Sequence, residues 1–291
     1  MEKILVTGAD GFFGSRFVEF YRNTYKVIGL NHHDLDITDE NTTMKIIKEI
    51  NPDYIVHAAA ISDTGTCERN PKLSFDVNVM GTINIAKACY ETNTKIMYLS
   101  SDQVYNGNSE YGPYTETTIP APNNVYGKHK LEAEVNILKL LENGVVLRLT
   151  WLYGLPERNK KTNSNIICNI VKTSMRNEAI KLPANEYRGI TYIYDLLDNF
   201  HEFFKLPSGI YNAGSENNLA TYEIGEVILN ELGLDDRIKD LLIKDLENYK
   251  YHKRDLRICN EKLGKYNIYF DETKQSIKKC IKEFSLDQKH I

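Results

Sequence analysis

The sequence lacks the features that mark several large classes of protein. Its five cysteines form no Cys-x-x-Cys pair and are odd in number, so neither a disulfide framework nor a zinc site is indicated. No apolar run approaches the ~18 residues that a membrane-spanning helix needs, and no internal repeat or low-complexity segment is present. We therefore expect a protein of the reducing cytoplasm, with no metal and no membrane partner.

The chain also has no excess of positive charge. Its 36 Lys and Arg residues are outnumbered by 40 Asp and Glu residues, and the formal net charge is −4 at pH 7. Neither nucleic acid nor an anionic membrane would attract such a chain overall. The apolar Ile4–Val6 follows directly on Met1–Lys3, which leaves no room for a secretory signal and agrees with a cytoplasmic location. With 291 residues, 42% hydrophobic and 26% charged, the chain suits one large globular domain or two closely packed ones.

A glycine-rich turn stands between a predicted strand and a predicted helix near the N-terminus. Lys3–Thr7 reads as a buried strand, and residues 13–22 have helical periodicity. Gly8, Gly11 and Gly14 would let the backbone approach a phosphate closely and let the helix pack on the strand. Because the N-terminus of a helix favours anions, this arrangement indicates a dinucleotide pyrophosphate site. A glycine turn without a ligand is the alternative.

Strands and helices alternate along the first half of the chain. Strands are predicted at Lys3–Thr7, Lys26–Leu30, Tyr54–Val56, Lys95–Leu99 and Val145–Arg148, and helices at 13–22, Glu40–Ile50, Pro71–Thr92 and across Tyr126 and Lys130. Further helices are predicted at Ile166–Met175, up to Phe204, at Thr221–Leu232 and at Glu272–Phe284, with another strand at Gly209–Asn212. The alternation predicts an α/β fold with a doubly wound parallel sheet of the Rossmann type. We expect an NAD(P)-binding domain at 1–150, a return to the sheet near 189–214, and a smaller C-terminal substrate-binding lobe from 151–188 and 215–291.

Small or polar clusters follow the carboxyl ends of four predicted strands. They are the glycine turn, His57-Ala58-Ala59-Ala60, Ser100-Ser101 and Thr150-Trp151. Ligands of open α/β sheets bind at this edge, so we expect the clusters to border one crevice. The alanines would let a flat cofactor lie against the backbone, although close packing also requires small residues. Trp151, the single tryptophan, is either a core aromatic or a platform for a sugar or base.

The end of the second strand leaves both NADH and NADPH open. Dinucleotide domains often have an acid there to bind the ribose, or an arginine to bind a 2′-phosphate. This chain has Asn31-His32-His33, which offers neither, and the two histidines either meet a phosphate or lie on the surface. Asn78 and Asn84 lie near one face of the predicted helix Pro71–Thr92, where we expect them to bond to backbone rather than to take part in catalysis.

Tyr126 and Lys130 form a Tyr-x-x-x-Lys pair on a predicted helix. Residues four apart share a helix face, about 5–6 Å apart at their Cβ atoms. A lysine cation and an oxidised nicotinamide would each favour the phenolate of a tyrosine, whose ordinary pKa is about 10. With a reduced nicotinamide the phenol would keep its proton and donate it to a ketone, with a serine hydroxyl holding the carbonyl oxygen. The pair predicts carbonyl–alcohol redox chemistry, although its spacing also arises by chance in a chain with 19 tyrosines.

Taken together, these strings resemble the extended short-chain dehydrogenase/reductase family and, within it, the dTDP-4-dehydrorhamnose reductases. Thr7-Gly8-x-x-Gly11-x-x-Gly14 is similar to the nucleotide loop of that family, and Asp36-Ile37 to its adenine contact. Ser100-Ser101-Asp102-x-Val104-Tyr105 resembles the Ser-Thr-Asp-x-Val-Phe string of the rhamnose enzymes. Leu147–Gly154 is similar to the segment that carries their substrate-contacting tryptophan. The resemblance covers almost the whole chain.

The resemblance implies roles for individual residues. Tyr126 becomes the proton donor, Lys130 its partner and a contact of the nicotinamide ribose, and Ser101 the hydroxyl that bonds the carbonyl oxygen. The cofactor, NADPH or NADH, would also contact Gly8, Asp10, Gly11, Phe12, Phe13, Gly14, Asn31, Asp36, Ile37, His57, Ala58, Ala59, Ala60, Asn78 and Ser100. The substrate would contact Asp102, Gln103 and Trp151 besides Ser101 and Tyr126.

Several positions depart from the pattern of the rhamnose enzymes. His57 stands where they usually have Asn, Gln103 replaces a common Tyr, and Gly189-Ile190 replaces a residue–Pro pair. The segment Ser62–Glu68 does not match their usual loop. These departures fall mostly on the substrate side, so the sugar, its nucleotide and the stereochemistry of the product stay open.

The resemblance implies NAD(P)H-dependent reduction of a nucleotide-linked 4-keto-6-deoxy sugar, most simply to form dTDP-L-rhamnose. Two other functions stay open. A nucleotide-sugar epimerase or dehydratase on the same scaffold would hold its cofactor tightly and show no net oxidation. A non-catalytic, NADP-binding regulatory subunit of the methionine adenosyltransferase type would keep the same residues without turnover. A homodimer is one assembly that the resemblance allows.

Overall fold

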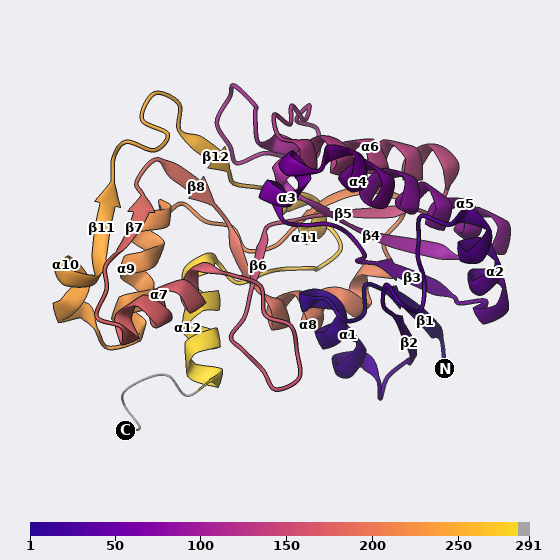
Figure 1. The fold of residues 1–291 in the computed structure, drawn as a ribbon, viewed down its shortest axis with the longest axis horizontal. Helices are drawn as coiled ribbons and strands as arrows, with labels where there is room; N and C mark the ends of the chain where they lie inside the picture. Colours follow the sequence, from indigo (N-terminus) through magenta and orange to yellow (C-terminus); the bar gives the residue numbers. More distant parts are fainter. Residues whose placement is uncertain (285–291) are drawn as a thin grey trace.

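The computed structural model describes residues 1–284 and has a six-stranded parallel sheet at its centre. The strand order is β10-β5-β4-β3-β1-β2, and each neighbouring pair runs parallel (Figure 1). The predicted α/β fold with a doubly wound sheet of the Rossmann type is confirmed. Residues 285–291, which the predicted lobe includes, lie outside the described residues. Within residues 1–284, no helix is both long and apolar enough to span a membrane.

The central strands and the longer helices follow the predicted order, whereas the short strands outside the central sheet were not predicted from the sequence. The central strands are β1 (Lys3–Thr7), β2 (Lys26–Leu30), β3 (Tyr54–His57), β4 (Lys95–Ser101), β5 (Val145–Leu149) and β10 (Gly209–Ala213). Short strands pair outside that sheet: β6 (Trp151–Tyr153) with β9 (Ile190–Tyr192), β7 (Ile180–Pro183) with β11 (Leu242–Asp245), and β8 (Glu186–Arg188) with β12 (Arg254–Leu256). The helices are α1 (Phe12–Tyr21), α2 (Glu40–Ile50), α3 (Thr64–Arg69), α4 (Pro71–Phe75), α5 (Thr82–Thr92), α6 (Val125–Leu140), α7 (Ile166–Met175), α8 (Ile193–Phe203), α9 (Thr221–Glu231), α10 (Ile238–Leu241), α11 (Glu261–Gly264) and α12 (Thr273–Glu283). The segment η1 (Asp76–Gly81) is a π-helix, which is wider than an α-helix. The segments η2 (Asp102–Tyr105) and η3 (Asp235–Arg237) are 3-10 helices, which are tighter.

The central strands bury alternate side chains on the two faces of the sheet. In β1, Ile4 and Val6 belong to one core cluster and Leu5 to the other, as the two-residue period of a strand requires. Helices α1 and α8 cover the first face, where the rings of Phe17 and Phe200 lie 5.0 Å apart. Helices α2, α5 and α6 cover the second face (Figure 1). Because helices cover both faces of the sheet, we expect a ligand to bind at the carboxyl ends of the strands.

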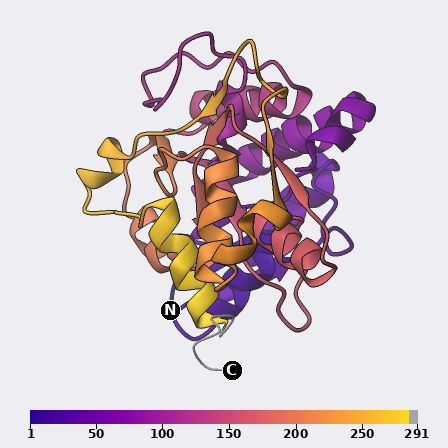
Figure 2. The ribbon, with the colours of Figure 1, turned by 90° about the vertical axis from the view of Figure 1, so that its left-hand side faces the viewer.

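A smaller lobe lies beside the carboxyl ends of β4 and β5. It contains α7, α9 and α12 and the strand pairs β7–β11 and β8–β12, and Figure 2 brings its helices to the front. The apolar side chains of α7, α9 and α12 join the same core cluster as those of α1 and α8. A continuous apolar core therefore fixes the lobe against the sheet. The division at residues 150, 188 and 215 stays a prediction.

The helix predicted at Pro71–Thr92 is continuous but not uniform. Its middle is the π-helix η1, which lies between α4 and α5. Within it, Asn78 accepts a hydrogen bond from Ile61 N (2.8 Å) and donates to Ile61 O (2.9 Å). A Cβ at Gly81 would lie 2.7 Å from the side chain of Ile37, so glycine permits the close approach of this helix. The π-helix therefore contains the residue that joins this helix to the loop after β3. The expected hydrogen bonding of Asn78 to backbone is confirmed.

Candidate functional site

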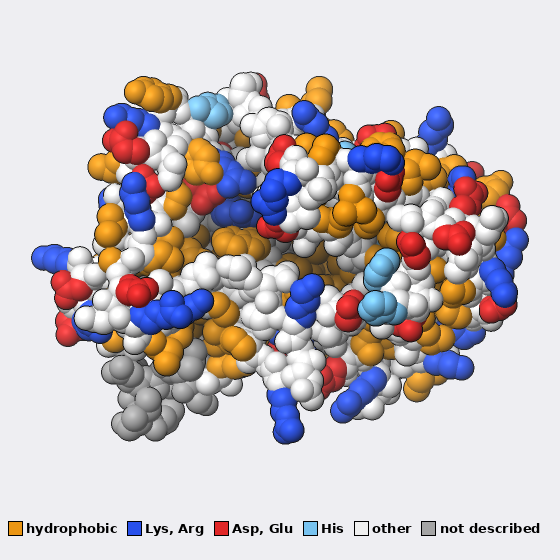
Figure 3. Space-filling view, viewed as in Figure 1, with side chains coloured by type: hydrophobic (Ala, Val, Ile, Leu, Met, Phe, Trp, Pro, Cys, Tyr) orange, Lys and Arg blue, Asp and Glu red, His pale blue; other side chains and the backbone are white. Residues whose placement is uncertain are grey.

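A cavity of ≈ 380 Å³ lies at the carboxyl edge of β1, β2 and β3. It is bordered by the glycine turn, the end of β2, the alanines after β3 and η1. The lining residues are Thr7, Gly8, Asp10, Gly11, Leu30, Asn31, His32, Leu35, Asp36, Ile37, Ala58, Ala59, Ala60, Ile61, Leu73, Val77 and Lys161. Figure 3 shows that this face of the molecule is hollowed across its middle, with hydrophobic side chains at the bottom of the hollow. Most of the residues predicted to bind a cofactor therefore border one space.

The glycine turn has the close backbone contacts that its sequence predicts. Gly8 has a φ of +69°, and a Cβ there would lie 2.9 Å from the backbone of Ala59. A Cβ at Gly14 would overlap the carbonyl oxygen of Gly8. Helix α1 starts after Gly11, and within residues 1–284 no side chain caps its first turn by a hydrogen bond. Its free N–H groups suit an anion next to the cavity.

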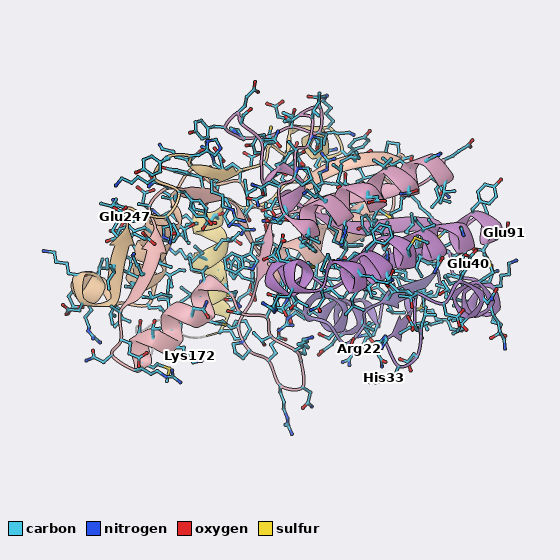
Figure 4. All side chains as sticks on the ribbon, turned by 45° about the horizontal axis from the view of Figure 1, so that its top comes forward. Arg22, His33, Glu40, Glu91, Lys172 and Glu247 are labelled. Carbon is cyan, nitrogen blue, oxygen red and sulfur yellow. The ribbon has the colours of Figure 1, made fainter. Side chains whose placement is uncertain are left out.

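The loop after β2 supplies an ionised carboxylate to the rim of the cavity. Asp36 accepts hydrogen bonds from the N–H (3.0 Å) and the hydroxyl (2.7 Å) of Thr38, and these bonds hold the pKa of Asp36 below its ordinary value. Asn31 uses its side-chain oxygen to accept the N–H of His33 (2.7 Å), which shapes the turn. Both histidines are exposed, but only His32 borders the cavity, whereas His33 lies at the periphery in Figure 4. Of the two histidines, His32 is the one near enough to meet a ligand in this cavity.

Lys161 is a cavity residue that the sequence analysis did not identify. The fully buried Arg16 of α1 explains its position, because one nitrogen, Nη1, donates both to Phe12 O (2.9 Å) and to Lys161 O (2.9 Å). The same guanidinium donates to Glu157 at 2.7 Å. Arg16 thus ties the loop at 155–161 to the first turn of α1. In the sequence, Lys160-Lys161 reads as part of a charged loop, and no local signal connects it with the glycine turn.

His57 is a structural residue of the same edge. Thr82 donates to Asn78 O (2.8 Å) and therefore accepts from His57 Nε2 (3.0 Å). Thr7 accepts the N–H of Ala59 (3.2 Å), and because His57 carries its proton on Nε2, the Thr7 hydroxyl donates to Nδ1 (2.7 Å). One ring nitrogen of His57 donates a hydrogen bond and the other accepts one, as a neutral imidazole does. Burial and the nearby Lys130 lower the pKa of His57 to about 3, so the ring stays neutral and holds Ala59 at the cavity wall.

Tyr126 and Lys130 lie on α6, which begins at Val125 after the N-cap Asn124. The side-chain oxygen of Asn124 accepts the N–H of Gly127 (2.7 Å), which fixes the first turn. Lys130 Nζ donates to Leu99 O of β4 (2.8 Å) and lies 5.7 Å from the centre of the Tyr126 ring. Both side chains are buried. The predicted pair therefore shares a helix face that is turned toward the carboxyl end of β4.

The protonation of this pair differs from the expectation that Lys130 lowers the pKa of the phenol. Burial and the carboxylate of Asp102 raise the pKa of Tyr126 above its ordinary value, although the nearby hydroxyl of Ser101 acts the other way. Burial lowers the pKa of Lys130 to about 8. In the protein alone, the loss of water around the phenolate outweighs the attraction of the ammonium group. Tyr126 is therefore a protonated phenol at neutral pH, which is the form that donates to a ketone.

The residues predicted to contact substrate form a hydrogen-bonded cluster with two arginines of the lobe. Ser101 donates to Asp102 Oδ1 (3.1 Å), and Arg188 donates to Asp102 Oδ2 (3.1 Å). Arg254 donates to the side-chain oxygen of Gln103 (3.1 Å). The guanidinium of Arg188 also lies 5.0 Å from the centre of the Trp151 ring. Trp151 is only partly buried, so part of its ring remains accessible. Sequence reasoning missed both arginines, because neither belongs to a motif.

Ser100 takes part in a separate buried network. Its hydroxyl donates to Glu134 of α6, and Glu134 pairs with Arg148 of β5 (Nη2 to Oε2, 2.6 Å). Arg148 donates in turn to the hydroxyl of Tyr105 (2.8 Å). The side chain of Ser100 thus stabilises the packing of α6 on the sheet, and its contact with a cofactor stays a prediction. Within residues 1–284, no group of three or more His, Cys, Asp or Glu side chains is arranged to hold a metal ion.

The chain matches the family model described as RmlD substrate binding domain over residues 1–284. It is 28% identical over 240 residues to a dTDP-4-dehydrorhamnose reductase of Aggregatibacter actinomycetemcomitans, covering 79% of each chain. It is 31% identical over 236 residues to methionine adenosyltransferase 2 subunit beta of Xenopus laevis, covering 76% of this chain and 70% of that protein. The crystal structure of dTDP-4-dehydrorhamnose reductase from Bacillus anthracis in complex with NADP superposes with a TM-score of 0.86 at 22% identity. That superposition covers 97% of this chain and 99% of the other, and it shows a common fold.

Proposed function

Since the chain belongs to the RmlD substrate binding domain family, we propose that it reduces a nucleotide-linked 4-keto-6-deoxy sugar with NADPH or NADH. The simplest such reaction is the one named for its relative, the reduction of dTDP-4-dehydrorhamnose. One observation carries the proposal. A buried, protonated Tyr126 lies beside Ser101 and Lys130 at the sheet edge that also borders the cavity. A proton donor, a hydroxyl donor and a cavity at one edge suit carbonyl reduction.

The cavity residues fit a dinucleotide. Close approach of backbone at Gly8, an uncapped first turn of α1 and the small side chains Ala58 to Ala60 suit a pyrophosphate and a flat ring system. The ionised Asp36 at the rim suits a ribose hydroxyl or an adenine amino group. A bound nicotinamide would supply the hydride. Asn31 and His32, which border the cavity after β2, are neither an acid nor an arginine, so both NADH and NADPH stay open as cofactors.

In this proposal the protein's own side chains hold the ketone and supply one proton. Ser101 donates its hydroxyl hydrogen to the carbonyl oxygen, and Tyr126 gives its proton to the same oxygen as the carbon is reduced. Lys130, fixed by its bond to Leu99 O, stabilises the phenolate that remains. Asp102, Gln103 and Trp151 would contact the sugar.

The test of the proposal follows the absorbance of NADPH and NADH against a panel of nucleotide-linked 4-keto sugars. We expect consumption of one reduced cofactor for each sugar. Tyr126→Phe should lower kcat by about 10²–10⁴-fold while dinucleotide binding persists. Tyr90→Phe, a tyrosine that is 67% exposed on α5, is the matched control and should keep the wild-type rate. A Tyr126→Phe enzyme with more than about a tenth of the wild-type rate would show that the phenol is not the proton donor.

A second function is favoured by the identity of 31% to methionine adenosyltransferase 2 subunit beta. Under that alternative the chain binds a dinucleotide and a partner enzyme without turning over a sugar. Binding of NADPH with no consumption against any keto sugar, together with co-purification of an adenosyltransferase, would support it. An epimerase or dehydratase would instead convert the sugar without net loss of reduced cofactor. The same assay therefore separates all three.

A further inference from the structure

Arg188 connects the smaller lobe with the catalytic edge of the sheet. It ends β8, and its Nη2 lies 3.1 Å from Asp102 Oδ2 and 3.5 Å from Oδ1. The side chains of Arg188 and Asp102 are 12% and 1% exposed. The Nε of Arg188 is buried and has no hydrogen-bond partner among the described residues. A buried arginine in this position needs an explanation, because lobe packing alone would favour an apolar side chain.

Asp102 accepts the hydrogen bond that the proposed reaction requires the Ser101 hydroxyl to give to the substrate. Ser101 has a single O–H, and it donates that hydrogen to Asp102 Oδ1 at 3.1 Å. The oxygen of Ser101 accepts the N–H of Gln103 at 3.2 Å, so its position is fixed. A substrate carbonyl oxygen held by Ser101 must take the same hydrogen. Asp102 and the ketone therefore compete for one donor.

The groups around Asp102 decide how strongly it holds Ser101. The Gln103 amide lies 3.4 Å from Oδ1, and Tyr126 faces the carboxylate from α6. Arg254, on β12, is near enough to be affected by its charge but is bonded to Glu186 and Gln103. Among the described residues, Arg188 is the cation that donates hydrogen bonds to Asp102. A carboxylate that is neutralised by an arginine attracts a further hydroxyl less strongly than a bare one.

We propose that Arg188 is a positioning residue that neutralises Asp102 and thereby releases the Ser101 hydroxyl to the carbonyl oxygen of the substrate. This inference rests on the proposed reductase function. Arg188 acts through Asp102, so its effect depends on the carboxylate being present. The same ion pair holds the Arg188 guanidinium over the ring of Trp151, so the fluorescence of Trp151 should report on the pairing.

The first experiment is a double-mutant cycle on steady-state turnover, measured at an enzyme concentration high enough that slow variants still register. Arg188→Gln should lower kcat at least about tenfold, with a smaller change in KM, because the bare carboxylate keeps the Ser101 hydrogen. In the Asp102→Asn background, Arg188→Gln should change kcat by less than about twofold. Arg188→Lys, which keeps the charge, should retain more activity than Arg188→Gln. Equal losses from Arg188→Gln in both backgrounds would overturn the inference.

The second experiment does not depend on activity. Trp151 is the single tryptophan, so its fluorescence reports on the guanidinium beside it. Asp102→Asn should shift the emission as Arg188→Gln does, and the double variant should show no further shift. The double variant also removes the uncompensated buried charge, so it folds even if Arg188→Gln alone does not. Unchanged emission in Asp102→Asn would show that the carboxylate does not hold Arg188, and the inference would be wrong.

Arg257 provides a matched control in the same lobe. It pairs with Asp255 (2.7 Å) and lies 5.4 Å from the centre of the Tyr187 ring, but it touches neither Ser101 nor Asp102 in the described residues. Arg257→Gln should leave kcat and the Trp151 emission unchanged, and an effect as large as that of Arg188→Gln would contradict the proposed mechanism. If wild-type protein reduces no keto sugar, the proposed function fails, and the emission data still decide whether Asp102 holds Arg188.

Discussion

At the cavity end of the sheet edge, Gly8, Ala58 and Ala59 present backbone and small side chains, whereas at the proposed catalytic end, beside β4, Asp102 and Arg188 present charges that are already paired. The cavity end owes its shape to local conformation: a left-handed glycine, an uncapped helix and a run of alanines. The catalytic end is assembled by long side chains from β8, β12 and α6. We infer that changes at the first end should alter cofactor affinity, and changes at the second should alter stability or turnover.

The largest effect on stability is expected from Glu134→Gln at the catalytic end. Glu134 and Arg148 are 1% and 2% exposed, so the substitution leaves a buried guanidinium without its counter-ion. The free energy of unfolding should fall by about 3–5 kcal/mol in a urea titration. Glu40→Gln is the control, because Glu40 pairs with Lys87 at 2.8 Å on the surface and should cost less than about 1 kcal/mol. Similar losses in the two variants would refute a special role for the buried pair.

Gly8→Ala should produce the largest effect at the cavity end. A Cβ at this left-handed residue lies 2.9 Å from the backbone of Ala59, and the conformation itself costs about 1–2 kcal/mol for other residues. We expect the Kd for NADPH and NADH to rise at least about tenfold, with kcat at saturating cofactor nearly unchanged. Calorimetric titration measures the first and steady-state assay the second. Gly264→Ala on α11, where the nearest atom is 3.5 Å from the new Cβ, should bind as wild type does.

His57 lies between the two ends and should make stability depend on pH. Its folded pKa, about 3, is below the ordinary 6.5, so the unfolded chain takes up the proton first as pH falls. Stability should therefore decrease as pH falls below 6.5, by about 1.3 kcal/mol between pH 7.5 and 5.5. His57→Asn should remove that part of the pH dependence, measured as the difference between urea titrations of the two proteins. Parallel pH curves for both proteins would mean that His57 titrates normally.

The smallest effect is expected from Lys161→Ala on the loop that Arg16 ties to α1. An exposed lysine near a pyrophosphate contributes little, so the affinity for NADPH and for ADP should fall by about two- to fivefold. Binding of adenosine should not change, since it has no phosphate. A loss confined to NADPH would instead assign Lys161 to a 2′-phosphate. Lys172→Ala, an exposed lysine of α7 labelled in Figure 4, should have no effect.

The residues that could be predicted from the sequence lie close together along the chain. Tyr126 and Lys130 are one helical turn apart, and the glycine turn and the alanines each lie within a few residues. The contacts that sequence reasoning missed join distant segments: Arg188 and Asp102 are 86 residues apart, and Arg254 and Gln103 are 151 apart. The expected lowering of the Tyr126 pKa failed for a related reason. Burial depends on everything packed around the ring, whereas the i,i+4 spacing reports only one neighbour.

The sequence by itself determined the α/β alternation, the order of the strands along the chain and the edge of the sheet at which the cavity lies. These follow from hydrophobic period and turn chemistry, which act over a few residues. Only the tertiary structure decided which charges meet there, that Arg188 neutralises Asp102, that Arg16 brings Lys161 to the cavity and that His57 is held neutral. Ion pairs and desolvation depend on distances between segments that a local pattern does not encode.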